Sequence, residues 1–166
     1  MQSNQNQVQL STKIEQVACV ALGTMVLTDK GDIFYVGDTR YGQMPAEDEN
    51  QEKSLALDDQ MLFKQIRLPY KVSKIACGGD HMFVITDQDK VYGWGRNASA
   101  QLGIGFQQDH IDLPQLVPAF HDKVVTKIVC GPNYSAAITT SGRLMVCGSM
   151  EFGKLGLGSN MRNGFA

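Results

Sequence analysis

The chain has 166 residues, a formal net charge of −2 and 43% hydrophobic residues, which are ordinary values for a soluble globular protein. This charge argues against direct nucleic-acid binding, which usually requires a basic stripe and a high pI. No apolar run reaches the ~18 residues of a membrane span. The N-terminal residues 1–13 are polar and Gln-rich and lack the apolar core of a secretory signal, so we expect a cytoplasmic or nuclear location.

From residue 14 onward the chain repeats itself three times. Cys19, Cys77 and Cys130 are separated by 77 − 19 = 58 and 130 − 77 = 53 positions. The same two offsets relate four further triplets, namely Val17/Ile75/Ile128, Thr28/Thr86/Thr139, Gly37/Gly95/Gly148 and Met44/Leu102/Leu155. A period near fifty residues is typical of propellers, solenoids or arrays. The predicted units are about 14–71, 72–124 and 125–160, followed by a tail at 161–166.

The second unit shows the repeated pattern most clearly. Short runs rich in β-branched and aromatic residues predict strands at Val72–Ala76, Met82–Thr86 and Lys90–Trp94. The polar break between the second and third strands predicts a hairpin. At the turn of this hairpin the three units carry Gly31, Asp89 and Gly142, which predicts a positive φ there.

The first unit contains an acidic insertion between Ala46 and Lys64. Its interpretations are a solvated loop, a short helix around Ser54–Phe63, or a loop that docks a partner. In the docking interpretation the candidate residues are Asp48, Glu49, Glu52, Asp58 and Asp59.

Cysteine spacing argues against a disulfide framework and against zinc. Three equivalent positions cannot all pair with one another, and no CxxC spacing is present. We therefore predict that Cys19, Cys77 and Cys130 are buried, reduced thiols on equivalent strands.

Catalytic chemistry finds no support in the remaining polar residues. His81 has Gly23 and Tyr134 at its equivalent positions, so we expect it to bridge to a turn backbone rather than to act as a base. Ser135 has no nucleophile-elbow setting, and Trp94 is expected to pack in the core or between units. We also interpret His110 and His121 as too isolated to be metal ligands. No catalytic, cofactor-binding or metal residue is predicted, so we expect a protein that is not an enzyme.

The stretch Val91–Gly105 closely resembles the signature of the regulator of chromosome condensation repeat, with its Trp-Gly, Asn and Gln-Leu-Gly-x-Gly. Further matches are Ile75–His81, Leu113–Pro118, Ile128–Gly131 and Phe152–Gly158. The first unit departs from the pattern, with Tyr41–Met44 followed by Pro45 where glycine is expected. The resemblance implies an all-β fold of four-stranded β-propeller blades, with about three units in a partial or incomplete ring.

The function that this resemblance implies is a non-catalytic protein–protein interaction scaffold within a larger assembly. The alternatives in the family are a guanine-nucleotide exchange factor for a small GTPase and the substrate-recruiting part of a ubiquitin ligase. Expected partners are therefore other proteins, among them a chain that completes the propeller or a small GTPase, with no membrane and no cofactor. Cytoskeletal or ciliary association follows from the family alone.

Overall fold

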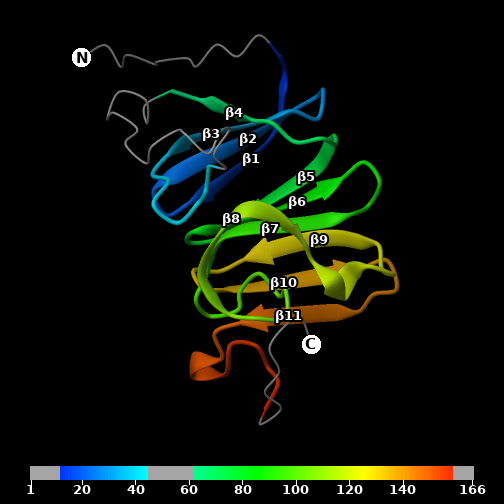
Figure 1. The fold of residues 1–166 in the computed structure, drawn as a ribbon. Coiled ribbons are helices and arrows are strands. Elements are labelled where there is room, and N and C mark those ends of the chain that lie inside the picture. The colour runs from blue at the N-terminus through cyan, green and yellow to red at the C-terminus, as the bar shows by residue number, and fades with distance from the viewer. Residues whose placement is uncertain (1–11, 45–61, 159–166) are drawn as a thin grey trace, which may run out of the picture.

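The structure is a computed structural model that describes residues 12–44 and 62–158. Three antiparallel sheets, which we call blades 1 to 3, are stacked in chain order (Figure 1). Blade 1 contains β1 (Ile14–Val20), β2 (Gly23–Thr28), β3 (Ile33–Gly37) and β4 (Lys64–Ile66). Blade 2 contains β5 (Val72–Cys77), β6 (His81–Thr86), β7 (Val91–Asn97) and β8 (Gln108–Leu116). Blade 3 contains β9 (Val125–Cys130), β10 (Tyr134–Thr139) and β11 (Leu144–Gly148). The predicted all-β blades are confirmed.

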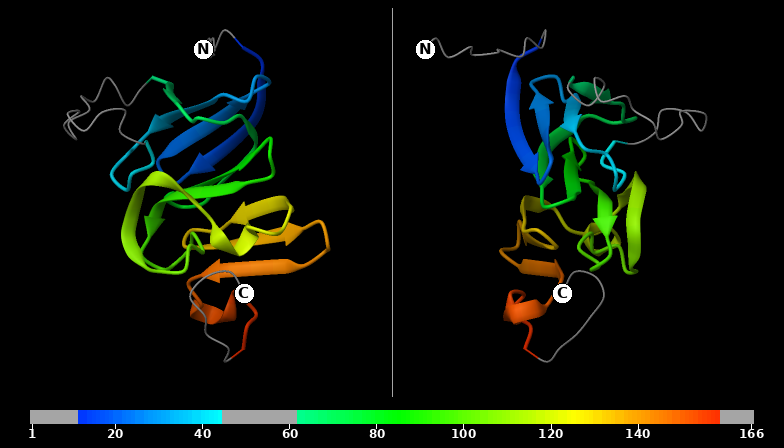
Figure 2. Two further views of the ribbon diagram at one scale, coloured as in Figure 1. Left: turned by 45° about the vertical axis from the view of Figure 1, so that its right-hand side comes forward. Right: turned by 90° about the vertical axis from the view of Figure 1, so that its left-hand side faces the viewer.

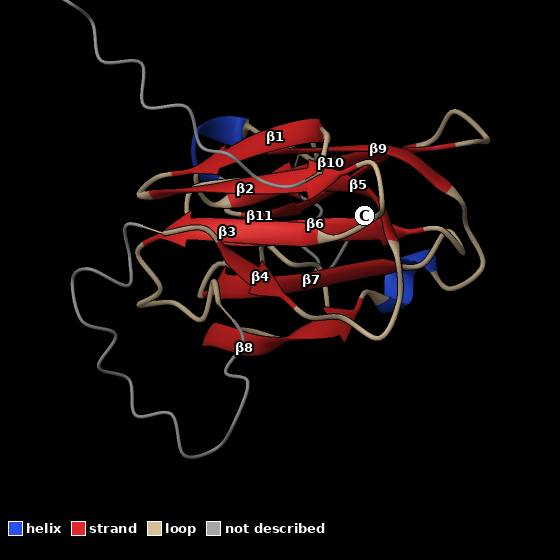
Figure 3. Cartoon of the chain, turned by 90° about the horizontal axis from the view of Figure 1, so that it is seen from above, coloured by secondary structure: helices blue, strands red, loops and turns tan. Residues whose placement is uncertain are grey.

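The strands follow one another in space in the same order in every blade. The first strands β1, β5 and β9 lie along one side of the stack, where β5 contacts both others (Figure 3). The fourth strands β4 and β8 lie at the opposite edge. Two further views show the blades as an open stack rather than a closed ring (Figure 2).

One turn joins the second and third strands in all three blades. The hydroxyl of the repeated threonine accepts the N–H four residues further on, which closes the turn with a side chain as well as with backbone. These pairs are Thr28 with Asp32 at 3.2 Å, Thr86 with Lys90 at 3.1 Å and Thr139 with Arg143 at 3.3 Å. The predicted positive φ at the turn is confirmed, with 76° at Gly31, 59° at Asp89 and 76° at Gly142.

The three strands predicted in the second unit correspond to β5, β6 and β7, with small shifts of their ends. The residues of β4 and β8 gave no strand signal of their own. Strand β8 is largely polar and contains Pro114, because it forms the outer edge of its sheet, where side chains face solvent and a missing N–H is tolerated.

Each blade uses one face to pack on the next blade, and we call this its downstream face. On blade 2 it carries Phe83 and Ile85, which lie against Thr126–Ile128 of β9. The equivalent residues of blade 1 are Met25 and Leu27. All four side chains belong to one continuous apolar core that runs through the three blades. A core of this kind joins neighbouring units, because a single sheet cannot bury both of its own faces.

The equivalent cysteines differ in burial, and the prediction that Cys19 is buried is wrong. All four cysteines are free thiols, with Cys19 exposed, Cys77 and Cys130 partly buried, and Cys147 buried. Cys130 lies on the same face of β9 as Ile128, which is beside Phe83 and Ile85 of blade 2, and Cys77 and Cys19 occupy the equivalent face of their strands. Cys77 and Cys130 have a preceding blade, whereas nothing in the described part of the chain precedes blade 1. Burial depends on the neighbouring unit, which equal sequence positions do not share.

We therefore expect thiol labelling to separate Cys19 from the other three cysteines. Burial raises the pKa of Cys130 to about 12 and also raises the pKa values of Cys77 and Cys147, so their reactive thiolates are scarce. Mass spectrometry of the native chain should show rapid labelling at Cys19 and slow labelling at the others. In denaturant all four should react at similar rates. Equal native rates would contradict this arrangement.

Helices are minor in the described residues. Two 3-10 turns of three residues, Pro118–Phe120 and Glu151–Gly153, follow β8 and β11. Within residues 12–44 and 62–158, no helix has the length and apolar character needed to cross a membrane.

Candidate interaction surface

The acidic docking loop lies outside the described residues, so Asp48, Glu49, Glu52, Asp58 and Asp59 remain a prediction. The described residues define two other kinds of surface, namely the joints between neighbouring blades and the faces at the two ends of the stack.

A loop carbonyl of one blade accepts hydrogen bonds from the next blade at both joints. Trp94 Nε1 of blade 2 donates to the carbonyl of Gln43 at 3.1 Å. At the second joint Cys147 Sγ and Ser135 Oγ donate to the carbonyl of Gln101, at 3.1 Å and 2.8 Å. Trp94 and Cys147 are repeat equivalents, as are Gln43 and Gln101. The sequence-based expectation that Trp94 packs in the core or between units is confirmed, since it is fully buried and bonded to blade 1.

The repeated glutamine fixes the shape of the loop that carries this carbonyl. Its side-chain oxygen accepts the backbone N–H two residues earlier, from Tyr41 to Gln43 and from Ser99 to Gln101, both at 2.9 Å. Both glutamines are buried. Sequence reasoning did not assign them this role, although their matching offset was a usable signal. In the third unit the equivalent is Lys154, which donates to Asn133 Oδ1 at 3.1 Å.

His81 pairs with Ser135 across the second joint, and not with a turn backbone as predicted. Its Nε2 lies 2.7 Å from Ser135 Oγ, and both side chains are fully buried. The single hydroxyl proton of Ser135 is already donated to Gln101. His81 must therefore donate from Nε2, which leaves no lone pair there to activate the hydroxyl. Despite its resemblance to a nucleophile–base pair, the contact is structural.

Burial makes the His81 contact sensitive to acid. Desolvation lowers the pKa of His81 from 6.5 to about 4 in the folded chain. The folded chain therefore holds His81 neutral. The stability that this neutral state contributes is complete above pH 6.5 and is lost as the pH falls from 6.5 toward 4. Over this window we expect the free energy of unfolding, measured in urea, to fall by about 3 kcal/mol on account of this one residue.

The matched variants for this pH effect are His81→Asn and His121→Asn. His81→Asn should be less stable at pH 7 and should lose much less stability on acidification than the wild-type chain. His121 is exposed, so His121→Asn should follow the wild-type pH profile. A wild-type profile that stays flat between pH 6.5 and 4 would contradict the buried, neutral state of His81.

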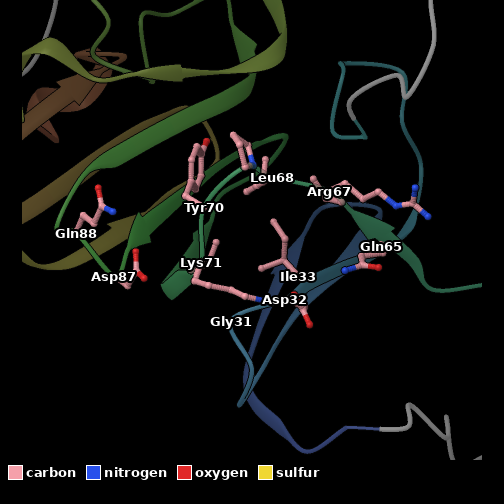
Figure 4. A pocket seen from close by; sticks show the side chains of 13 residues that line it. Gly31, Asp32, Ile33, Gln65, Arg67, Leu68, Tyr70, Lys71, Asp87 and Gln88 are labelled. Carbon is pink, nitrogen blue, oxygen red and sulfur yellow. Dashed lines mark hydrogen bonds and ion pairs between the residues drawn. The ribbon is translucent and has the colours of Figure 1, made fainter.

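A groove of about 570 Å³ opens between blades 1 and 2 (Figure 4). Its walls are the β2–β3 turn, the linker from Arg67 to Lys71 and the β6–β7 turn. Lys71 Nζ pairs with Asp32 Oδ1 at 2.7 Å across one wall, and Tyr70 of the linker stacks on Tyr92 at 4.4 Å between ring centroids. Its lining contains no His, Cys or Ser. The groove lining therefore offers no Ser–His or Cys–His pair.

Metal coordination also finds no support in the part of the chain that the structure describes, where no group of three or more His, Cys, Asp or Glu side chains could hold an ion. His110 lies near two exposed carboxylates of β8, with Nδ1 3.3 Å from Asp109 Oδ2 and Nε2 3.4 Å from Asp112 Oδ1.

Blade 3 leaves its downstream face open. Ile138 has 44% of its surface exposed, whereas its repeat equivalents Leu27 and Ile85 have 1% and 3% exposed. Val129, next to Ile138 on the same face, is also exposed. The face that packs on the following blade in units 1 and 2 is thus solvent-accessible apolar surface in unit 3.

Comparison with known protein families identifies the repeat that forms these blades. The regulator of chromosome condensation (RCC1) repeat matches residues 88–138, and a second description of the same repeat matches residues 72–101 and 125–154. Together the matches run from residue 72 to residue 154, half of the 166-residue chain. The chain belongs to the RCC1 repeat family. The matched part is units 2 and 3, consistent with the departures from the repeat pattern in unit 1.

Named relatives contain RCC1-like sequence within much longer chains. The probable E3 ubiquitin-protein ligase HERC4 of Rattus norvegicus is 31% identical over 87% of this chain, which spans 13% of that protein. The serine/threonine-protein kinase Nek9 of Mus musculus is 30% identical over 89% of this chain, which spans 14% of that protein.

Solved structures share the RCC1-like fold. Human WBSCR16 is 25% identical with a TM-score of 0.74, covering 92% of this chain and 38% of that one. Prp20p of Saccharomyces cerevisiae is 21% identical with a TM-score of 0.76, covering 89% of this chain and 33% of that one. At this identity the likeness to Prp20p concerns the fold alone.

Proposed function

We propose that the chain is a protein–protein interaction scaffold that works within a larger assembly and receives a further repeat unit or a partner on the downstream face of blade 3. The observation that carries this proposal is the exposure of Ile138, at a position where both other units bury their side chain. An apolar face beside an open strand edge is a typical interaction surface.

The free energy gained at the other two joints supports this proposal. Fully burying an Ile or Leu side chain contributes about 1.5–3 kcal/mol, and two of the three units gain this at their downstream faces through Leu27 and Ile85. Blade 3 presents the same kind of residue without a neighbour among the described residues. A partner that covers Ile138 and Val129 would stabilise blade 3 by burying apolar side chains, as blade 3 does for blade 2.

Sedimentation of the purified 166-residue chain tests this proposal. We expect self-association or aggregation of the isolated chain, relieved by Ile138→Glu or by a co-expressed partner. Leu22→Glu is the matched control, because Leu22 is also exposed, at 59%, but lies in the β1–β2 turn of blade 1, away from this face. A wild-type chain that is a soluble monomer with a cooperative melt and no partner contradicts the proposal.

A second candidate function is recruitment of substrate to a ubiquitin ligase, and the similarity to HERC4 supports it. The scaffold would then hold the protein that another segment or chain modifies. Fusion of the chain to a ubiquitin-ligase catalytic domain should direct ubiquitin onto the proteins that co-purify with it. The same transfer from a fusion that lacks this chain would contradict recruitment.

A further inference from the structure

A single side chain links the first strands of blades 1 and 2. Gln16 of β1 reaches the edge of β5, where its Oε1 accepts the N–H of Ile75 at 3.1 Å and its Nε2 donates to the carbonyl of Ser73 at 3.2 Å. One carboxamide therefore satisfies a donor and an acceptor that β5 directs away from its own sheet. This edge belongs to the side of the stack along which β1, β5 and β9 lie (Figure 3).

The joint between blades 2 and 3 has only half of this link. Lys74 occupies the position of Gln16 in the repeat, and its Nζ donates to the carbonyl of Thr126 at 2.8 Å, as Gln16 does to Ser73. An ammonium group carries three donors but no acceptor. Lys74 therefore cannot accept the N–H of Ile128, which is the repeat equivalent of Ile75.

The N–H of Ile128 points away from its sheet and is open to a ligand. Gly131 donates to the carbonyl of Tyr134 inside the sheet, so by alternation along β9 the N–H of Ile128 faces the other way. Within residues 12–44 and 62–158, no acceptor pairs with it. Ile128 is itself buried, and a shielded donor without an acceptor is unfavourable.

This donor lies at a pocket of about 200 Å³ that combines a cation with apolar walls. Lys74, Thr126 and Ile128 line the pocket on its polar side, and Phe83 and Ile85 belong to its apolar lining. An acceptor that is placed here meets the backbone N–H and the ammonium group together. Negative charge on that acceptor strengthens both contacts.

We propose that this pocket binds a glutamate side chain of a partner polypeptide, with one carboxylate oxygen on the N–H of Ile128 and the other beside Nζ of Lys74. Glutamate has the shape of the glutamine side chain that satisfies the equivalent edge at the first joint, and its charge complements Lys74. Its methylene groups pack against Phe83 and Ile85. The site is separate from Ile138, so it adds a contact to the scaffold function proposed above and does not depend on it.

Hydrogen exchange of the chain without ligand tests the open donor. The amide of Ile128 should exchange about tenfold faster than that of Ile75, although the two residues are repeat equivalents. Lys74→Gln should slow exchange at Ile128, because the new carboxamide repeats the Gln16 link. Lys30→Gln removes an exposed lysine from the β2–β3 turn and should change neither rate. Equal rates at Ile75 and Ile128 in the wild-type chain would overturn the open donor.

The probe for the site is the peptide acetyl-Ala-Ala-Glu-Ala-Ala-amide, titrated into the ¹⁵N-labelled 166-residue chain. Each chain carries Ile138→Glu, so that self-association does not broaden the NMR signals. We expect a saturable downfield shift of the Ile128 amide proton, which Lys74→Gln should abolish. The peptide with glutamine in place of glutamate should bind about fivefold more weakly, since it lacks the charge.

A gain-of-function variant provides the matched control. Gln16→Lys should open the same kind of site at the first joint, so that the Glu peptide also shifts the amide proton of Ile75. Equal shifts with the Glu and Gln peptides, or no shift at Ile128 with millimolar Glu peptide, overturn the carboxylate site. Tighter binding of inorganic phosphate than of the Glu peptide overturns the assignment to glutamate. The sedimentation result for Ile138→Glu is independent of these outcomes, so either proposal can fail while the other stands.

Discussion

Gly95→Val should remove most of the stability of the chain. Gly95 has a φ of 93°, and a Cβ there would lie 2.5 Å from the carbonyl oxygen of Asp80 and 3.0 Å from Cα of His81. These are backbone atoms of the strand pair, so they cannot rotate away. The expected loss is several kcal/mol from a total of about 5–15 kcal/mol, measured as a lower urea midpoint or as failure to fold.

Gly95→Ala and Gly105→Ala form the matched pair for this prediction. Gly105 has nearly the same φ, 94°, but a Cβ there meets nothing within 4 Å. Both alanines carry the same conformational strain of about 1–3 kcal/mol, so the difference between them isolates the contact with Asp80. Equal melting temperatures would show that the backbone at Gly95 is not as close as the structure places it.

Trp94→Ala should be the most damaging side-chain truncation at the joint between blades 1 and 2. Trp94 is fully buried and its Nε1 donates to the carbonyl of Gln43 at 3.1 Å. Removal of the ring leaves a cavity between two blades and an unpaired carbonyl, which together cost about 3–5 kcal/mol. Urea unfolding followed by far-UV circular dichroism measures the loss, because Trp94 is the single tryptophan of the chain.

Trp94→Phe separates packing from hydrogen bonding in the same experiment. Phenylalanine retains most of the apolar contact but cannot donate to Gln43, so a loss of about 1–3 kcal/mol is expected. If Trp94→Ala is no less stable than Trp94→Phe, the indole ring does not contribute to the joint as described.

Features within one unit were predictable from the sequence. The offsets of 58 and 53 identified equivalent positions, and the threonine–glycine turn could be predicted because Gly31 and Gly142 require a local backbone conformation. Strands β5, β6 and β7 carry their own β-branched and aromatic signal. Local chemistry of this kind does not depend on which blade lies next to it.

Features between units were not predictable in the same way. The contact of His81 with Ser135 joins residues at non-equivalent positions, so no repeat analysis pairs them. Cys19 and Cys77 occupy the same position in the repeat but differ in exposure, because among the described residues a blade precedes Cys77 and none precedes Cys19. The exposure of Ile138 likewise follows from the absence of a following blade among the described residues, not from its own sequence.

The hydrogen bonds to the loop carbonyls of Gln43 and Gln101 run in one direction along the stack. The acceptor carbonyl, of Gln43 or Gln101, always belongs to the earlier blade, and the donor, Trp94 or Ser135, to the later one. A contact between two copies that repeats this joint therefore uses two different surfaces, the end of one copy and the start of the other, and has no twofold symmetry. Any assembly that continues this joint is heterologous, so it closes into a ring only if the rotation between adjacent blades divides a full circle, and otherwise grows as a helical filament.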